Sequence, residues 1–99
     1  MAVSTIQKAP LDVTTRGIAL NSDTDFNTIL SRGRYYVNSP TGNNIPPGTW
    51  VSIDLIVLER ATDIRFWQIA LCYSSSPKIY YRVMRSASEF SAWTLLVTA

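Results

Sequence analysis

Residues 64 to 73, Ile-Arg-Phe-Trp-Gln-Ile-Ala-Leu-Cys-Tyr, are apolar on both faces when the segment is placed in an extended conformation. Side chains alternate across a strand, so the two apolar faces consist of Phe66, Ala70 and Cys72 and of Trp67, Ile69, Leu71 and Tyr73. Antiparallel sheets usually leave one face to water, and a strand that is apolar on both faces is buried on both. This segment is therefore expected in the centre of a sheet with a cover over its outer face.

Two covers for that outer face stay open from the sequence. Either the N-terminal arm or the Pro-rich loop folds over it, or a second copy of the chain packs against it. A chain of 99 residues has little material for a second cover, and a domain of this size buries only about 60 to 65% of its unfolded surface. We therefore expect an oligomer interface, and its residues are expected to be Phe66, Trp67, Ile69, Leu71 and Tyr73.

Further strand signals surround this segment. In residues 50 to 59 the odd positions are apolar, as expected for one buried face. The turn signal Ser74-Ser75-Ser76-Pro77 joins two of the segments into a hairpin. The expected strands cover residues 34–38, 50–59, 64–73, 78–85 and 93–97.

The N-terminal third has a different pattern. Residues 1–21 show no sustained period and are expected to form an extended arm. Ser22 with Asp25 three positions later resembles a capping box, which predicts a short helix ending near Gly33. The chain is thus expected to be all-β, a small antiparallel β-sandwich-like knob at residues 22–99 with one short helix near the N-terminal third.

The residue types argue against an enzyme. The chain has no histidine and one cysteine, Cys72, which excludes an internal disulfide and a zinc site of the usual thiolate and imidazole type. Asp23 and Asp25 are the close acidic pair, and they lie at the expected helix start, where acids stabilise the helix dipole. We expect no catalytic residue, no metal and no cofactor.

The charge pattern and the hydropathy restrict the partners. The net charge is +2 and the basic residues are scattered, so no nucleic-acid-binding stripe is expected. No stretch has the length of a secretory signal or of a bilayer-spanning segment. We expect a soluble product of the cytoplasm, without membrane insertion. If it acts outside the cell, it is expected to leave by lysis or within an assembled particle.

Aromatic rings and amides mix near the expected loops. Sugars are commonly held by a ring face together with a few planar polar groups. This mixture predicts a ligand-binding surface made of Asn43, Asn44, Trp50, Tyr80 and Arg82. Other roles stay open, because turn formation explains the two Asn equally well, core packing explains a tyrosine, and Trp50 could pack against a neighbouring subunit.

Four short motifs occur in a fixed order: Asp25-Phe26-Asn27-Thr28-Ile29, Gly33-Arg34-Tyr35-Tyr36-Val37, Ile79-Tyr80-Tyr81-Arg82 and Ser91-Ala92-Trp93-Thr94-Leu95. Over residues 22–97 this order resembles the knob domain of R-type pyocin and bacteriophage tail fibres. The chain departs from the family pattern at Phe26, where Leu is usual, and at Glu89-Phe90, where a Trp is common. Its middle strands are also more apolar than the Gly-rich strands of the family.

The resemblance implies a homotrimeric β-fold at the cell-contacting end of a fibre in the virion tail. The implied function is host-cell attachment through a bacterial surface glycan or protein, with other tail or fibre proteins as partners. The alternative is a structural trimerisation or spacer module, or an accessory virion subunit, without a ligand. The resemblance transfers no binding site, because it implies fold roles for Tyr35, Trp93 and Gly33.

Overall fold

Strands make up most of the molecule in a computed structural model, which describes residues 17–59, 66–86 and 89–98. The all-β class expected from the sequence is confirmed. The elements in chain order are β1 (Ile18–Ala19), η1 (Phe26–Thr28), β2 (Gly33–Asn38), β3 (Ser52–Glu59), β4 (Phe66–Tyr73), β5 (Lys78–Ser86), β6 (Glu89–Phe90) and β7 (Thr94–Thr98).

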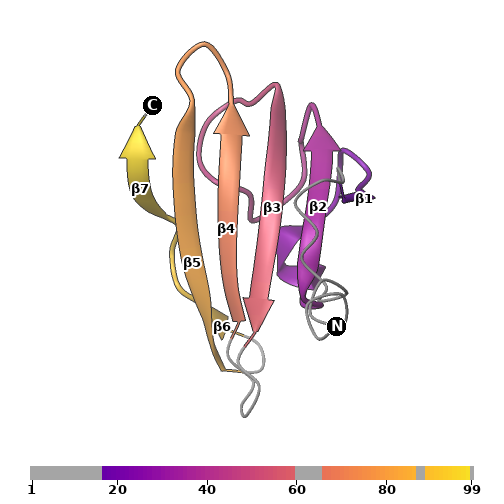
Figure 1. Ribbon diagram of the computed structural model, residues 1–99, viewed down its shortest axis with the longest axis vertical. Coiled ribbons are helices and arrows are strands. Elements are labelled where there is room, and N and C mark those ends of the chain that lie inside the picture. Colours follow the sequence, from indigo (N-terminus) through magenta and orange to yellow (C-terminus); the bar gives the residue numbers. More distant parts are fainter. Residues whose placement is uncertain (1–16, 60–65, 87–88, 99) are drawn as a thin grey trace, which may run out of the picture.

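The strands form one sheet in the order β1-β2-β3-β4-β5-β6, and β7 also pairs with β5 (Figure 1). The β1 strand runs parallel to β2, and every other pairing is antiparallel. The expected strands agree with β2, β3, β5 and β7 to within two residues at each end. The expected strand at 64–73 agrees with β4, except that residues 64 and 65 lie outside the described part of the chain.

The register of the ladder separates the side chains into two faces. In β3 the core positions are Ile53, Leu55 and Val57, all with no exposed area. They lie opposite Cys72, Ala70 and Gln68 of β4, whose side chains share that face because antiparallel partners point to the same side. The buried face continues onto the even positions of β5, from Tyr80 to Met84.

This buried face is covered by a layer of irregular chain. Figure 1 shows the connection between β2 and β3, residues 39–51, passing across the far side of the sheet, and η1 lies on the same side. The second layer of the expected sandwich is therefore built from a loop and a single turn, with no strand in it. The reason lies in the sequence of the connection, where Pro46, Pro47 and Gly48 break any ladder.

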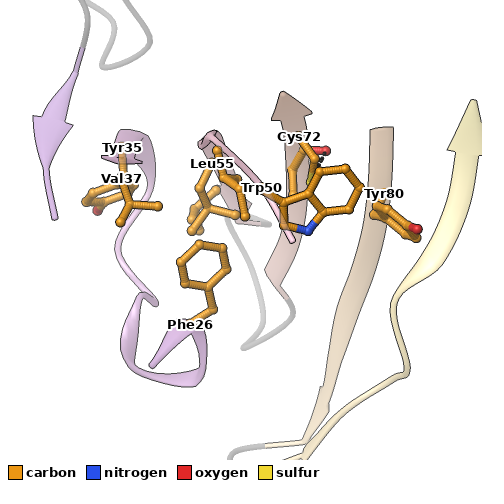
Figure 2. Close-up of a cluster of buried hydrophobic side chains, with 10 residues drawn as sticks. Phe26, Tyr35, Val37, Trp50, Leu55, Cys72 and Tyr80 are labelled. Atoms are coloured by element: carbon orange, nitrogen blue, oxygen red, sulfur yellow. Dashed lines mark hydrogen bonds between the residues drawn. The ribbon is translucent and has the colours of Figure 1, made fainter. Parts of the chain in front are cut away.

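Side chains from the covering layer fill the core. Figure 2 shows Phe26 pointing from η1 toward Leu55, while Trp50 lies between Leu55 and Tyr80. The Trp50 and Tyr80 rings meet edge to face with centroids 6.1 Å apart, and Trp50 Nε1 donates a hydrogen bond to the Pro46 carbonyl at 3.1 Å. The connection is thus anchored by its own tryptophan.

The expected helix is shorter in the structure, where it is a single 3-10 turn. The Asp25 side chain caps it by accepting a hydrogen bond from the Asn27 backbone N–H at 2.9 Å. The turn ends after Thr28, and the Phe26 carbonyl, which a longer helix would use, accepts a hydrogen bond from Gln68 Nε2. The expected helix end near Gly33 was wrong, and so was the expected capping residue Ser22, because Asp25 is the N-cap.

Backbone hydrogen bonds tie the covering layer together. The Thr41 N–H donates to the Ser22 carbonyl at 2.8 Å, and the Phe26 N–H donates to the Asn43 carbonyl at 3.2 Å. Most of the expected arm, residues 1–16, lies outside the described residues. Its end joins the sheet, because Ile18 and Ala19 form β1 and the Leu20 N–H donates to the Tyr36 carbonyl at 2.8 Å.

Candidate functional site

The second face of the sheet holds the Arg34–Asp54 ion pair at 3.5 Å near β2, and over β3, β4 and β5 it is apolar. This apolar part carries no described cover. We call it the open face, and it consists of Ile56, Leu58, Trp67, Ile69, Leu71, Tyr73, Ile79, Tyr81 and Val83. Figure 1 views the sheet with η1 and the 39–51 connection on the opposite side. Trp67 is 44% exposed and Tyr73 is 47% exposed, so large rings on this face reach solvent.

The register places the apolar side chains of three strands side by side. Ile69 lies opposite Ile56 of β3 and Tyr81 of β5. The Trp67 and Tyr81 rings stack with centroids 5.9 Å apart. An apolar surface that is continuous across three strands is typical of a protein interface, because single exposed apolar residues are ordinary but contiguous patches are not.

Four of the five expected interface residues share the open face: Trp67, Ile69, Leu71 and Tyr73. Phe66 does not, and this corrects the sequence-based set. Alternation turns Phe66 to the other side of β4, where it packs against the buried core. The same alternation places Gln68 in the core with no exposed area.

A cleft lies at the edge of the covering layer. It has a volume of about 500 Å³ and is lined by Asn27, Asn44, Ile45, Pro47, Arg82, Phe90, Ser91, Ala92 and Trp93. We call it the Arg82 cleft. Four separate segments meet there: η1, the 39–51 connection, β5 and the chain from β6 to β7.

Arg82 is 4% exposed although it carries a charge. Its guanidinium lies over the rings of Phe90 and Trp93, at 4.0 and 4.4 Å from their centroids. Burial lowers the pKa of Arg82 to about 10, against an opposing effect from the Asp25 carboxylate. The side chain therefore stays charged at neutral pH, held by the two rings through cation–π attraction.

Gln68 links Arg82 to η1. Its Oε1 accepts a hydrogen bond from Arg82 Nε at 2.8 Å. Its Nε2 donates to the carbonyls of Phe26 at 2.8 Å and Ile29 at 2.9 Å. Sequence reasoning missed Gln68, and the signal for it was an amide at a core position of an apolar strand.

Two polar atoms among the lining residues have no hydrogen-bond partner. They are Arg82 Nη2 and Asn27 Oδ1, and both are buried. Leaving such a donor or acceptor unpaired costs about 1 to 3 kcal/mol. One donor and one acceptor are thus unsatisfied among the described residues, and because both are buried a molecule in the cleft reaches them only when the side chains over them move.

The structure brings together two of the five expected ligand residues, Asn44 and Arg82, in the Arg82 cleft. Asn43 is exposed on the same connection, outside the lining. Trp50 is 6% exposed and Tyr80 is 8% exposed, so both rings belong to the core. This corrects their expected role as ligand-stacking residues, because packing against each other and against the sheet leaves no free ring face.

Three of the lining residues that the sequence analysis did not assign to a ligand contribute an amide or a ring: Asn27, Phe90 and Trp93. Phe90 and Trp93 follow β5 in the chain. The antiparallel β5-β6 pairing, which is irregular between Met84 and Ser86, reverses the chain direction and brings both rings against the Arg82 guanidinium. Trp93 also donates from Nε1 to the Asn44 carbonyl at 2.9 Å. The site therefore depends on long-range contacts that no local motif describes.

The described residues offer little for catalysis. Within them, no group of three or more Cys, Asp and Glu side chains is placed to hold a metal ion. Cys72 is 2% exposed, and burial raises the pKa of its thiol to about 12, so it carries no thiolate at neutral pH. In a search of the described part of the chain, no helix has the length and apolarity to cross a membrane.

Comparison of the chain with protein-family models, with curated proteins and with solved structures finds no match. The assignment of function therefore depends on the residues, on their motifs and on the two surfaces described above.

Proposed function

We propose that this chain is a non-enzymatic attachment module from the receptor-facing end of a bacteriophage tail fibre or a phage-tail-like bacteriocin, and that it works as a homo-oligomer, a trimer by the family resemblance. Its receptor is a bacterial surface glycan or protein. The proposal starts from four motifs in the order that the tail-fibre knob domain shows. Its strongest support is that residues of three of those motifs meet at one place in the fold.

That place is the Arg82 cleft. The Asp-Phe-Asn-Thr turn supplies Asn27, the Ile-Tyr-Tyr-Arg strand supplies Arg82, and the Ser-Ala-Trp segment supplies Trp93. Trp93 contacts Phe26 edge to face with centroids 6.4 Å apart. The three motifs are far apart in sequence but adjacent in space. This adjacency favours a shared origin with the tail-fibre knob domain, and not chance, as the reason for the order of the motifs.

The open face supports association of several copies. Its exposed rings and continuous aliphatic surface fit burial against other copies of the chain. In a trimer this face packs against a different surface of the neighbouring copy, because self-complementary contacts belong to two-fold dimers. Several copies on one fibre also favour attachment, since linked weak sites bind a repetitive cell surface far more tightly than one site does.

A structural role without a ligand is the second candidate. The open face alone favours it, because a trimerisation cap or spacer needs an interface and no binding site. The two candidates differ in one respect: the attachment module retains affinity for host cells when it is purified as an oligomer, and the spacer does not.

The test combines the mass in solution with binding to cells. Light scattering at micromolar concentration should give a multiple of the 11.1 kDa chain mass, and the labelled oligomer should bind host bacteria saturably. A stable monomer overturns the proposed assembly. An oligomer without saturable binding to any host strain overturns attachment in favour of the spacer.

A variant on the open face makes the mass measurement specific. Trp67→Asp should dissociate the oligomer while the far-ultraviolet circular dichroism is retained, because a carboxylate in an apolar interface is strongly unfavourable. Val51→Asp is the matched control, since Val51 is 69% exposed and precedes β3 outside the open face. Equal dissociation by both variants, or by neither, contradicts an interface at Trp67.

A further inference from the structure

The Arg82 cleft has a charge without a partner in its lining. Arg82 is the charged member of the lining, and no Asp or Glu is among the lining residues. Asp25, the acid that acts on the pKa of Arg82, has its Oδ1 engaged by the Asn27 backbone N–H and by Asn44 Nδ2 at 2.9 and 2.8 Å. The guanidinium is therefore contacted by two rings and one neutral amide, with the Asp25 carboxylate acting on its charge, and its Nη2 has no acceptor among the described residues. A charge-assisted hydrogen bond from an anionic ligand would supply that acceptor.

The lining of the cleft also contains an unsatisfied acceptor. Asn27 Oδ1 is buried without a hydrogen-bond partner, as is Arg82 Nη2. A ligand that satisfies both must bring an acceptor for the guanidinium and a donor for the amide oxygen. A carboxylate with a neighbouring hydroxyl has this pair of groups, whereas a phosphate monoester dianion offers acceptors alone.

The remaining walls fit the carbon skeleton of a sugar. Ile45 and Pro47 supply apolar contacts, and the Trp93 indole is fixed by its hydrogen bond to the Asn44 carbonyl. A volume of about 500 Å³ accommodates a single sugar ring with room for its neighbour in a chain. The Phe90 ring lies over the guanidinium and is half-buried, so binding at Arg82 requires this ring to turn aside.

We infer that the Arg82 cleft binds an acidic sugar, with the carboxylate on Arg82 and an adjacent hydroxyl donating to Asn27. The ligand is then a uronic-acid type unit of an acidic bacterial surface polysaccharide. This inference rests on the proposed attachment function and specifies its receptor class. It uses one of the residues expected from sequence to bind a ligand, Arg82, and adds Asn27.

The test is a titration of the full chain followed by ¹⁵N NMR. The reporters are the Arg82 Nε–H, bonded to Gln68 Oε1, and the Trp93 Nε1–H, bonded to the Asn44 carbonyl. The probes are sodium glucuronate, glucose, sodium acetate and inorganic phosphate at matched ionic strength. Glucuronate should shift both reporters saturably with a Kd of about 1 mM, the range expected for so small a ligand.

The other probes distinguish the parts of the inference. Glucose and acetate should bind about tenfold or more weakly than glucuronate, since each lacks one of the two groups. Equal shifts with glucose overturn the carboxylate, and equal shifts with acetate or phosphate overturn the sugar. No saturable shift of either reporter with glucuronate up to about 50 mM overturns the site.

Two variants of one residue test the geometry. Asn27→Asp has the same size and places a carboxylate beside Arg82, so glucuronate should bind at least about tenfold more weakly. Asn43→Asp is the control, because it makes the same change on the exposed part of the connection, outside the cleft lining. Asn27→Ala removes the acceptor without adding a charge. The ratio of the affinity for glucuronate to the affinity for acetate should therefore fall toward one.

The outcome for the sugar is separable from the outcome for attachment. Wild-type oligomer that adheres to host cells but ignores glucuronate overturns the acidic-sugar site and leaves attachment standing. Chain that binds glucuronate but adheres to no host overturns attachment and leaves the site standing. If Asn27→Asp abolishes both activities in a chain with a dispersed NMR spectrum, the cleft is the receptor site.

Discussion

Arg82 and Gln68 lie opposite each other in the β4-β5 ladder, and Arg82 Nε donates to Gln68 Oε1 at 2.8 Å. The amide end of Gln68 donates to two carbonyls of the η1 segment, those of Phe26 and Ile29. One side chain thus fixes the orientation of a buried cation and attaches the covering layer to the sheet. The pair connects the architecture of the core with the chemistry of the Arg82 cleft.

Gln68→Leu should destabilise the fold by about 3 to 5 kcal/mol. It leaves Arg82 Nε and the Ile29 carbonyl unpaired and removes one of the two donors to the Phe26 carbonyl, while the volume hardly changes. The free energy of unfolding in urea measures the effect. Gln68→Glu is the control: its carboxylate still accepts from Arg82 but has no N–H for Phe26 and Ile29, so it isolates the part due to η1. A loss below about 1 kcal/mol for Gln68→Leu contradicts the bridging role.

The strands were predictable because their signal is local. Alternation in β3 and the turn signal before β5 needed no knowledge of the rest of the chain, and the boundaries agree to within two residues. The length of η1 was not predictable in this way. It is set by the Gln68 side chain, which uses the η1 carbonyls from 39 to 42 residues away in sequence.

The site was less predictable for the same reason. Arg82 and Asn44 were expected at a ligand surface and do meet in one cleft. Trp50 and Tyr80 were assigned to it because a ring near a loop has the same sequence signature whether it faces solvent or core. Their burial follows from the path of the 39–51 connection across the sheet, which composition does not encode.

Trp93→Ala should cost about 2 to 4 kcal/mol, less than for a fully buried tryptophan because Trp93 is half-buried. The variant removes the ring under Arg82, the edge contact with Phe26 and the hydrogen bond to Asn44. Trp93→Phe keeps a ring and loses the N–H, so about 1 kcal/mol is expected. Urea unfolding of the two variants separates these contributions, and a cost below about 1 kcal/mol for Trp93→Ala would show that the ring supports nothing.

The burial of Cys72 should appear as a loss of stability in alkali. Burial raises the pKa of its thiol from an ordinary value near 9 to about 12. As the pH rises, the unfolded chain therefore releases this proton before the folded chain does. The contribution of the buried thiol to the free energy of unfolding is complete below pH 9 and is lost as pH rises toward 12. In that window the free energy of unfolding falls by about 1.4 kcal/mol per pH unit.

The range from pH 9 to 10 is the cleanest part of that window. Burial also raises the pKa of Tyr35 above its ordinary value of 10, while Arg82 contributes with the opposite sign only above about pH 10. Cys72→Ala should flatten the pH dependence of the unfolding free energy between 9 and 10, even though the smaller side chain lowers stability at every pH. Parallel curves for wild type and variant refute the burial of a protonated thiol.

Gly42→Ala should loosen the covering layer, because Gly42 packs against the backbone that precedes η1. A Cβ at this position would overlap the carbonyl oxygen of Thr24 and lie 2.9 Å from the carbonyl carbon of Asp23. Both are backbone atoms, so relief requires the connection to move away from residues 22–25. The expected cost is about 1 to 3 kcal/mol.

Local exchange shows whether that cost arises in the covering layer. The Thr41 N–H donates to the Ser22 carbonyl at 2.8 Å, and its hydrogen exchange should accelerate in Gly42→Ala more than that of the central β4 amides. Asn43→Ala is the control, since it changes the next side chain, which is exposed, and keeps the carbonyl that accepts from Phe26. Uniform acceleration across the sheet and the connection would instead mean that the layer and the sheet unfold as one unit, with no separate loosening at Gly42.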